Sequence, residues 1–299
     1  MKKLIVILGP TAIGKTSLGI RIANHYNTEI ISADSRQFFS ELSIGVARPS
    51  ESELASAKHH FIGFLPIEEH YNAGKFERDA LEVIHHLFEK SDFVVCVGGS
   101  GLYINALLNG LDELPSDPSV KVELVVMLEE QGIEALQKEL EILDPEYFAQ
   151  VDQSNPHRLI RALEVMKITG RKFSEQRVKA SVQRNFDIVK IGLRSDREWM
   201  YNRINQRVDI MMTEGLLEEA KSVFSRKELN ALQTVGYREL FDHFEGKLTL
   251  AEAIDKIKQH TRNFAKRQMT WWRREEDIHW IDADVEANQL EAAIRFIDL

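Results

Sequence analysis

Eight residues near the start of the chain carry the clearest chemical pattern in the sequence. They match G-x-x-x-x-G-K-[ST] and are Gly9, Pro10, Thr11, Ala12, Ile13, Gly14, Lys15 and Thr16. Glycines in such a loop let backbone N–H groups turn inward around an anion, and the lysine adds a point charge. The Thr16 hydroxyl is suited to Mg²⁺. The loop therefore predicts a site for a di- or triphosphate or a diphosphate ester, but it does not identify the group transferred.

An acidic residue, Asp34, follows the next short apolar segment, residues 29–32. In doubly wound sheets, ligands gather at the carboxyl ends of the strands, so we expect Asp34 to face the phosphate-binding loop. A carboxylate there can hold Mg²⁺ through water or accept a proton from an attacking nucleophile. The alternative is that Asp34 caps a short helix over residues 35–39.

A glycine-rich segment, Gly98–Tyr103, stands in the same relation to the apolar run at residues 93–97. Three glycines in four residues let a backbone approach a ligand closely, and Ser100 offers a hydroxyl. A tight strand-to-helix turn would explain the glycines equally well. The second acidic residue of an NTPase hydrolytic strand is missing here, which weakens motor and switch-GTPase interpretations.

Two basic segments indicate an anionic macromolecule. Arg158 and Arg161 lie three residues apart on a predicted helix. Over residues 256–274, helical spacing places an apolar stripe between two basic flanks. The stripe consists of Ile254, Ile257, Phe264, Trp271 and Trp272, and the flanks of Lys258, Arg262, Lys266 and Arg273 on one side and Lys256, Arg267 and Arg274 on the other. Such a helix suits a phosphodiester backbone, although an ordinary solvated helix packing on the core remains the alternative.

Continuous apolar strands are predicted to position these groups. The runs at 4–8 and 93–97 do not alternate, which is typical of parallel strands covered on both faces. Further strands are expected at 29–32, 188–193 and, at an edge, 279–282. Helical patterns cover 17–26, 73–90, 120–142 and 156–166, and three or four more lie between 193 and 274. We therefore expect an α/β fold with a P-loop NTPase-like parallel sheet core flanked by helices and an inserted helical domain. The expected limits are 1–112 for the first part of the core, 113–186 for the insertion, and 187–299 for the return to the sheet and the C-terminal helices.

The composition limits the remaining possibilities. The 299 residues carry 38 Lys and Arg against 47 Asp and Glu, a net charge of −9, and a single cysteine, Cys96. One cysteine excludes a disulfide framework and a thiolate-cluster zinc site, and it fits a reducing cytosol. The acidic balance argues against a nucleic-acid partner, but net charge averages over the whole surface, so the basic strip at 256–274 can still meet RNA. With no run approaching membrane-span length, we expect a cytoplasmic protein without membrane contact, by default a monomer.

Ten segments in chain order resemble the tRNA dimethylallyltransferases, also called tRNA isopentenyltransferases, of the bacterial type. They are Gly9–Thr16, Ser32–Gln37, Ile44–Pro49, His59–His60, Phe76–Ala80, Val97–Tyr103, Asn155–Val165, Arg203–Val208, Val235–Glu239 and Thr261–Arg274. The phosphate-binding loop alone occurs in many unrelated enzymes. The succession of D-S-R-Q, G-G-[ST]-G-L-Y and K-R-Q-x-T-W is specific to this family.

The resemblance implies transfer of a dimethylallyl group from dimethylallyl diphosphate to N6 of adenosine 37 in the tRNA anticodon loop. By this resemblance the loop cradles the diphosphate, with Lys15 and a Mg²⁺ on Thr16 neutralising charge. Asp34 takes a proton from the amino group, and Ser100, where the family usually has Thr, orients that amino group or Asp34. The implied tRNA contacts are Asp34, Ser35, Arg36, Gln37, Ser100, Arg158, Leu159, Ile160, Arg161, Lys266, Arg267, Arg273 and Arg274.

Two other function classes remain compatible with the residues alone. One is a P-loop small-molecule or nucleotide kinase in which Asp34 is the base for an acceptor hydroxyl. The other is a catalytically idle nucleotide-binding RNA module. The basic helix favours RNA over a metabolite, and the intact Lys15, Thr16 and Asp34 argue against an idle protein.

Overall fold

The centre of the fold is a parallel sheet, as the apolar strands predict. The computed structural model describes residues 2–112, 114–177, 182–284 and 288–299. Within these residues six strands form one sheet in which every neighbouring pair is parallel. Their order across the sheet is β3 (His59–His60), β2 (Ile30–Ser32), β4 (Phe93–Val97), β1 (Lys3–Leu8), β5 (Asp187–Arg194) and β6 (Ile278–Asp282).

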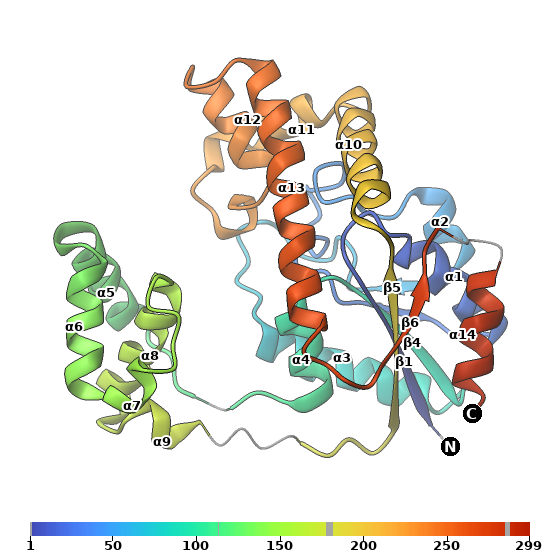
Figure 1. Cartoon of the computed structure of the whole chain (residues 1–299), viewed down its shortest axis with the longest axis horizontal. Coiled ribbons are helices and arrows are strands. Elements are labelled where there is room, and N and C mark those ends of the chain that lie inside the picture. Colours follow the sequence, from blue (N-terminus) through green and yellow to red (C-terminus); the bar gives the residue numbers. More distant parts are fainter. Residues whose placement is uncertain (1, 113, 178–181, 285–287) are drawn as a thin grey trace. The chain divides into compact units, whose positions relative to one another are not determined.

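Successive side chains of β1 enter two different cores, which explains why the strand is apolar throughout. Leu4, Val6 and Leu8 pack with α3 (Ala73–Leu87) and α4 (Gly101–Asn109). Ile5 and Ile7 pack on the other face with α1 (Lys15–His25) and α14 (Gln289–Ile297). Figure 1 shows these two helix pairs on opposite sides of the strands. Because strand side chains alternate between faces, a strand covered on both sides must be apolar at every position.

The chain divides into two compact units, residues 1–108 with 183–299, and residues 109–182. Beyond the sheet, the first unit contains the short α2 (Glu51–Ser56) and a group of helices after β5. That group comprises α10 (Arg197–Thr213), α11 (Leu216–Val223), the 3₁₀ turns η1 (Phe224–Arg226) and η2 (Asn230–Leu232), α12 (Tyr237–Phe244) and α13 (Leu250–Trp272). These helices share a third core with residues from the loops at 39–42 and 65–67.

The second unit is helical and has a core of its own. It contains α5 (Pro118–Gln131), α6 (Ile133–Leu143), α7 (Pro145–Phe148), α8 (Pro156–Thr169) and α9 (Phe173–Gln176), drawn in green to yellow-green in Figure 1. Leu124, Leu140 and Leu163 are among its fully buried residues. The unit covers residues 109–182, so it starts four residues before the expected start at 113 and ends four residues before the expected end at 186.

Three local expectations need correction. The pattern at 120–142 is two helices rather than one, because Gly132 adopts φ +79°, a value that favours glycine and ends α5. The short helix considered as the alternative for residues 35–39 does not form: residues 35–38 form turns and Phe39 forms a β-bridge with Leu65. On α13 the predicted apolar stripe is only partly buried: Trp272 is 3% exposed, whereas Phe264 and Trp271 are 39% and 37% exposed.

Candidate active site

The phosphate-binding loop connects β1 to α1 and has the conformation of an anion cradle. Gly9 and Gly14 have φ of +141° and +104°, which glycine adopts without steric cost. The loop lines a cavity of about 470 Å³ that also receives Asp34 from the end of β2. Lys15 Nζ donates to the carbonyl oxygen of Pro10 at 2.8 Å. Burial lowers the pKa of Lys15 to about 8, with Asp34 opposing and Arg207 reinforcing this shift, so the site favours a neutralising anion.

The loop is also held from outside, by α10 and α13. Arg203 Nε donates to the carbonyl oxygen of Ala12 at 3.0 Å, and Ala12 itself has the unusual φ of +65°. From α13, the Gln268 side chain accepts a hydrogen bond from the backbone N–H of Thr11, with 2.8 Å between N and Oε1. Two helices therefore fix the backbone on which the phosphate contacts depend.

Asp34 lies where two cavities meet. Its Oδ1 accepts the backbone N–H of Arg36 at 3.1 Å, so Asp34 caps a turn and not a helix. The carboxylate lines the phosphate cavity and also a second cavity of about 500 Å³. Thr11 and Arg207 line both cavities as well. A carboxylate in this position can reach an acceptor in one cavity while a diphosphate occupies the other.

The second cavity is lined mainly by apolar and aromatic side chains, and it lies between α10, α13 and the glycine-rich loop. The aliphatic and aromatic residues of its wall are Val46, Ala47, Leu102, Tyr103, Ile204, Val208, Met211, Leu216, Val235, Ile257, Phe264, Trp271 and Trp272. Such a wall suits a small branched hydrocarbon and a planar base. The sequence did not locate this cavity, because its wall combines loops and helices far apart in the chain.

The glycines at 98–101 make room for protein groups. A Cβ on Gly98 would overlap the backbone of Ala33, and one on Gly101 would lie 2.8 Å from the ring of Trp271. Ser100 Oγ accepts the backbone N–H of Ser35 at 3.0 Å and lies 3.1 Å from Ser35 Oγ. Close packing against Ala33 and α13 thus explains glycine at positions 98 and 101 and holds Ser100 beside the loop that carries Asp34.

Comparisons with known proteins identify the family. A model described as IPP transferase matches residues 37–275. The chain belongs to the IPP transferase family. A tRNA dimethylallyltransferase of Christiangramia forsetii is 54% identical, over 94% of this chain and 93% of its own. The full-length tRNA isopentenylpyrophosphate transferase from Bacillus halodurans superposes with a TM-score of 0.69 at 33% identity, covering 100% of both chains. A eukaryotic dimethylallyltransferase, described as acting on tRNA, superposes with a TM-score of 0.81 at 26% identity, covering 99% of this chain and 78% of its own.

Membership of the IPP transferase family confirms the resemblance seen in the sequence and the expected α/β fold. The named bacterial relatives are prenyl-transferring enzymes that act on tRNA, so the comparisons lend the kinase alternative no support. No helix in the described part of the chain is long and apolar enough to cross a membrane.

Two of the expected tRNA contacts in this IPP transferase are used within the protein. The Arg36 guanidinium donates to the carbonyl oxygens of Asn230 at 2.6 Å and Ala231 at 3.2 Å. Gln37 Nε2 donates to the carbonyl oxygen of Ala47 at 2.8 Å. Both side chains also line a cavity, Arg36 the second and Gln37 the first. They hold the surrounding loops in place at the site.

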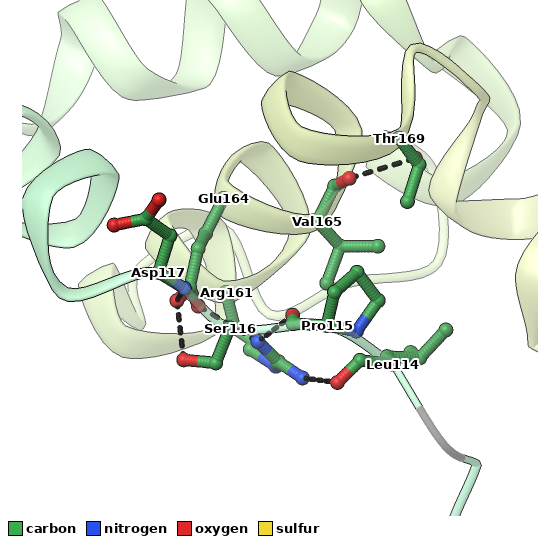
Figure 2. A network of polar contacts seen from close by, with 8 residues as sticks. All are labelled: Leu114, Pro115, Ser116, Asp117, Arg161, Glu164, Val165 and Thr169. Atoms are coloured by element: carbon green, nitrogen blue, oxygen red, sulfur yellow. Dashed lines mark hydrogen bonds and ion pairs between the residues drawn. The ribbon is translucent and has the colours of Figure 1, made fainter.

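The expected contacts on α8 belong to the second unit. Leu159 and Ile160 are 0% and 5% exposed in its core, which corrects the expectation that their side chains touch tRNA. Arg158 is exposed. Figure 2 shows Arg161 reaching toward the chain before α5, where it donates to the carbonyl oxygens of Leu114 and Pro115. The Arg161 guanidinium also pairs with Glu164 at 2.8 Å, so it stabilises this unit whatever else it binds.

The cations near the end of α13 face different directions. Arg267 lines the second cavity, with its guanidinium 5.8 Å from the Phe264 ring. Lys266 faces a different side of the helix, with its ammonium 5.8 Å from the ring of Tyr201. Arg273 and Arg274 follow the end of α13 and are exposed. Lys266 and Arg267 therefore lie on different sides of α13, as the two predicted basic flanks require.

Sequence reasoning missed three residues of the site: Arg203, Arg207 and Gln268. Arg207 lines both cavities, and burial lowers its pKa against the opposing effect of Asp34. Arg203 and Gln268 bind the loop backbone directly. One signal was available for Gln268. It lies eleven residues after Ile257, which is about three helical turns, so it falls within the apolar stripe. An amide buried in such a stripe needs a hydrogen-bond partner.

Proposed function

We propose that this chain transfers a dimethylallyl group from dimethylallyl diphosphate to N6 of adenosine 37 in the tRNA anticodon loop and releases diphosphate. The observation that carries the proposal is the position of Asp34 between the phosphate cavity and the apolar cavity. In this arrangement the diphosphate lies in the first cavity. The dimethylallyl carbon and the base meet at the carboxylate.

The donor end of the reaction needs charge neutralisation as the C1–O bond breaks. The backbone N–H groups of the loop and the Lys15 ammonium stabilise the departing diphosphate, and Arg207 adds a second cation to the same cavity. Because the burial of Lys15 lowers its pKa to about 8 in the free protein, an arriving diphosphate favours the charged form. This pairing strengthens as negative charge develops on the leaving oxygen.

The acceptor end needs a base. As N6 of the adenine attacks C1, its proton passes to the Asp34 carboxylate, and the electron pair of the C1–O bond leaves with the diphosphate. Ser100 acts through Ser35, since its hydroxyl is within hydrogen-bond distance of that residue in the structure. An adenine stacked in the anticodon loop must be extruded to reach this point, and the partly exposed Trp271 and Phe264 offer surfaces for it.

A magnesium ion fits the donor set at this site. Among the described residues no cluster of three or more His, Cys, Asp or Glu side chains could hold a metal by itself. Mg²⁺ keeps several waters and commonly binds through one or two protein oxygens together with substrate phosphates. Thr16, which lines the phosphate cavity, supplies such an oxygen, and the diphosphate would supply the others. When bound, the ion would neutralise charge on the diphosphate.

The partner proposed for the basic surface is the anticodon stem-loop. Arg267 at the cavity and the exposed Arg273 and Arg274 supply cations that can meet phosphate oxygens. We further propose that the inserted unit, through Arg158, helps to clasp the same RNA. The net charge of −9 then keeps binding confined to these places.

The proposal is tested by incubating the protein with unmodified tRNA, Mg²⁺ and labelled dimethylallyl diphosphate, with labelled ATP in a parallel reaction. Label in tRNA from the prenyl donor alone supports the proposal, and its position at adenosine 37 follows from nuclease digestion. Phosphoryl transfer from ATP to any acceptor would instead favour a kinase.

A further inference from the structure

One buried amide connects the two sides of the proposed reaction. Gln268 on α13 is 6% exposed, and both ends of its side chain amide are used. Its Oε1 accepts the N–H of Thr11 in the phosphate-binding loop at 2.8 Å. Its Nε2 donates to the carbonyl oxygen of Gly99 at 2.9 Å.

The two loops that Gln268 joins carry different substrates in the proposed reaction. The Thr11 loop binds the diphosphate of the donor. The Gly99 loop places Ser100, whose hydroxyl meets Ser35 next to Asp34 on the acceptor side. We infer that Gln268 is a positioning residue that sets the separation between the donor cradle and the acceptor base. This inference rests on the proposed function.

The chemistry of the contact supports an alignment role. A glutamine buried within an apolar stripe is costly unless both its donor and its acceptor are satisfied, and here they are. The contact is also close, because a Cβ on Gly99 would overlap Nε2. A two-ended hydrogen bond fixes direction as well as distance, which packing by an apolar side chain of equal length does not.

Alignment of this kind acts on the chemical step. Displacing reacting groups by about 1 Å can cost about 100-fold in rate while leaving binding largely intact. A side chain that only filled space would be replaceable by an apolar one of similar volume. Gln268→Met keeps the length of the side chain and removes both hydrogen bonds, so it separates the two roles.

The experiment measures single-turnover transfer to tRNA for the wild type, Q268M and the control Q259M, whose glutamine lies exposed on the same helix. We expect Q268M to lose about 100-fold in the maximal rate, with half-saturating concentrations of both substrates within about threefold, and Q259M to match the wild type. A Q268M rate within threefold of the wild type overturns the inference.

A second measurement keeps the inference testable independently of transfer. Hydrogen exchange without substrate should show faster exchange confined to residues 9–16 and 98–101 in Q268M, with exchange in the β strands unchanged. Equal exchange in Q268M and the wild type overturns the inference whatever the activity. Absence of transfer by the wild type, with the exchange difference present, would count against the proposed function instead. If Q268M unfolds, Q268N serves in its place, because its shorter side chain cannot span the two loops.

Discussion

Gly99 and the end of the Gln268 side chain are in such close contact that a larger residue at position 99 would displace the Gln268 amide. A Cβ there would overlap the Nε2 atom that donates to the Gly99 carbonyl. Gly99 does not have a positive φ. Glycine at this position therefore leaves room for the amide of a residue 169 positions later in the chain.

Gly99→Ala should reproduce the loss seen on removing Gln268. We expect a fall of about 30- to 100-fold in single-turnover rate, because the added methyl group displaces the amide from both loops. In the double variant G99A/Q268A the overlap disappears, so the two losses should not multiply. A double-mutant cycle of rates checks this, and fully multiplicative losses would contradict the contact.

Diphosphate affinity should depend on pH above about 8. Lys15 has its pKa lowered to about 8 in the free protein, and a bound anion favours the charged form. Affinity for dimethylallyl diphosphate should therefore be level below pH 8 and fall by up to tenfold per pH unit above it, with proton uptake on binding. Calorimetry in buffers of different ionisation enthalpy measures this uptake. Lys15→Arg stays charged and should show no such fall; an equal fall in both proteins would place the titration elsewhere.

Asp34→Asn should remove the base and preserve the surroundings. Asparagine keeps the side chain oxygen that caps the Arg36 N–H but cannot take up the N6 proton. We expect the rate of transfer to fall by about 100- to 10,000-fold, while tRNA binding changes by less than threefold. Filter binding and single-turnover transfer give the two quantities. Turnover close to that of the wild type would exclude Asp34 as the base.

The salt dependence of tRNA binding should depend on the two cations that follow the end of α13. Removing Arg273 and Arg274 by substitution with Gln should reduce the slope of log affinity against log salt by about 1 to 2. The control is K221Q/R295Q, which removes two exposed cations on α11 and α14. An unchanged slope in the first variant, or equal changes in both, would place the RNA surface elsewhere.

Arg161 should contribute to the stability of the inserted unit. Its removal leaves the Glu164 carboxylate, 3% exposed, with only Ser116 and the backbone N–H of Asp117 as partners. Arg161→Ala should lower the free energy of unfolding of this unit by about 1–3 kcal/mol. Arg158→Ala, at an exposed position, should change it by less than about 0.5 kcal/mol. Denaturant unfolding, followed by hydrogen exchange of residues 109–182, measures the change in unfolding free energy for the two variants.

The parts of the fold that are encoded locally could be predicted from the sequence. The phosphate-binding loop, the strand at 93–97 and the Asn155 cap of α8, whose side chain accepts the Arg158 N–H at 3.3 Å, all lie in short windows with clear residue types. The strands are apolar throughout because the sheet is covered twice, and that pattern is readable without knowing the partners.

Roles that depend on distant partners could not be predicted. Arg36, Arg161 and Gln37 are typical RNA-binding residue types, yet their side chains bind carbonyl oxygens of neighbouring loops. Phe264 and Trp271 fit an apolar stripe, but they border a cavity that forms only when α10 and the glycine-rich loop come together. Helical spacing defines which residues share a face and does not say whether protein or ligand covers it.

The inserted unit begins and ends at the same place. The backbone N–H of Val182 donates to the carbonyl oxygen of Asn109 at 2.8 Å, so the two boundary residues are hydrogen-bonded neighbours. Between them, the unit has its own buried core. Residues 109–182 therefore form an insertion that could be removed: a short turn between residues 108 and 183 would close the chain without separating any strands of the sheet. Its size and surface can therefore change while the sheet and the phosphate-binding loop keep their geometry.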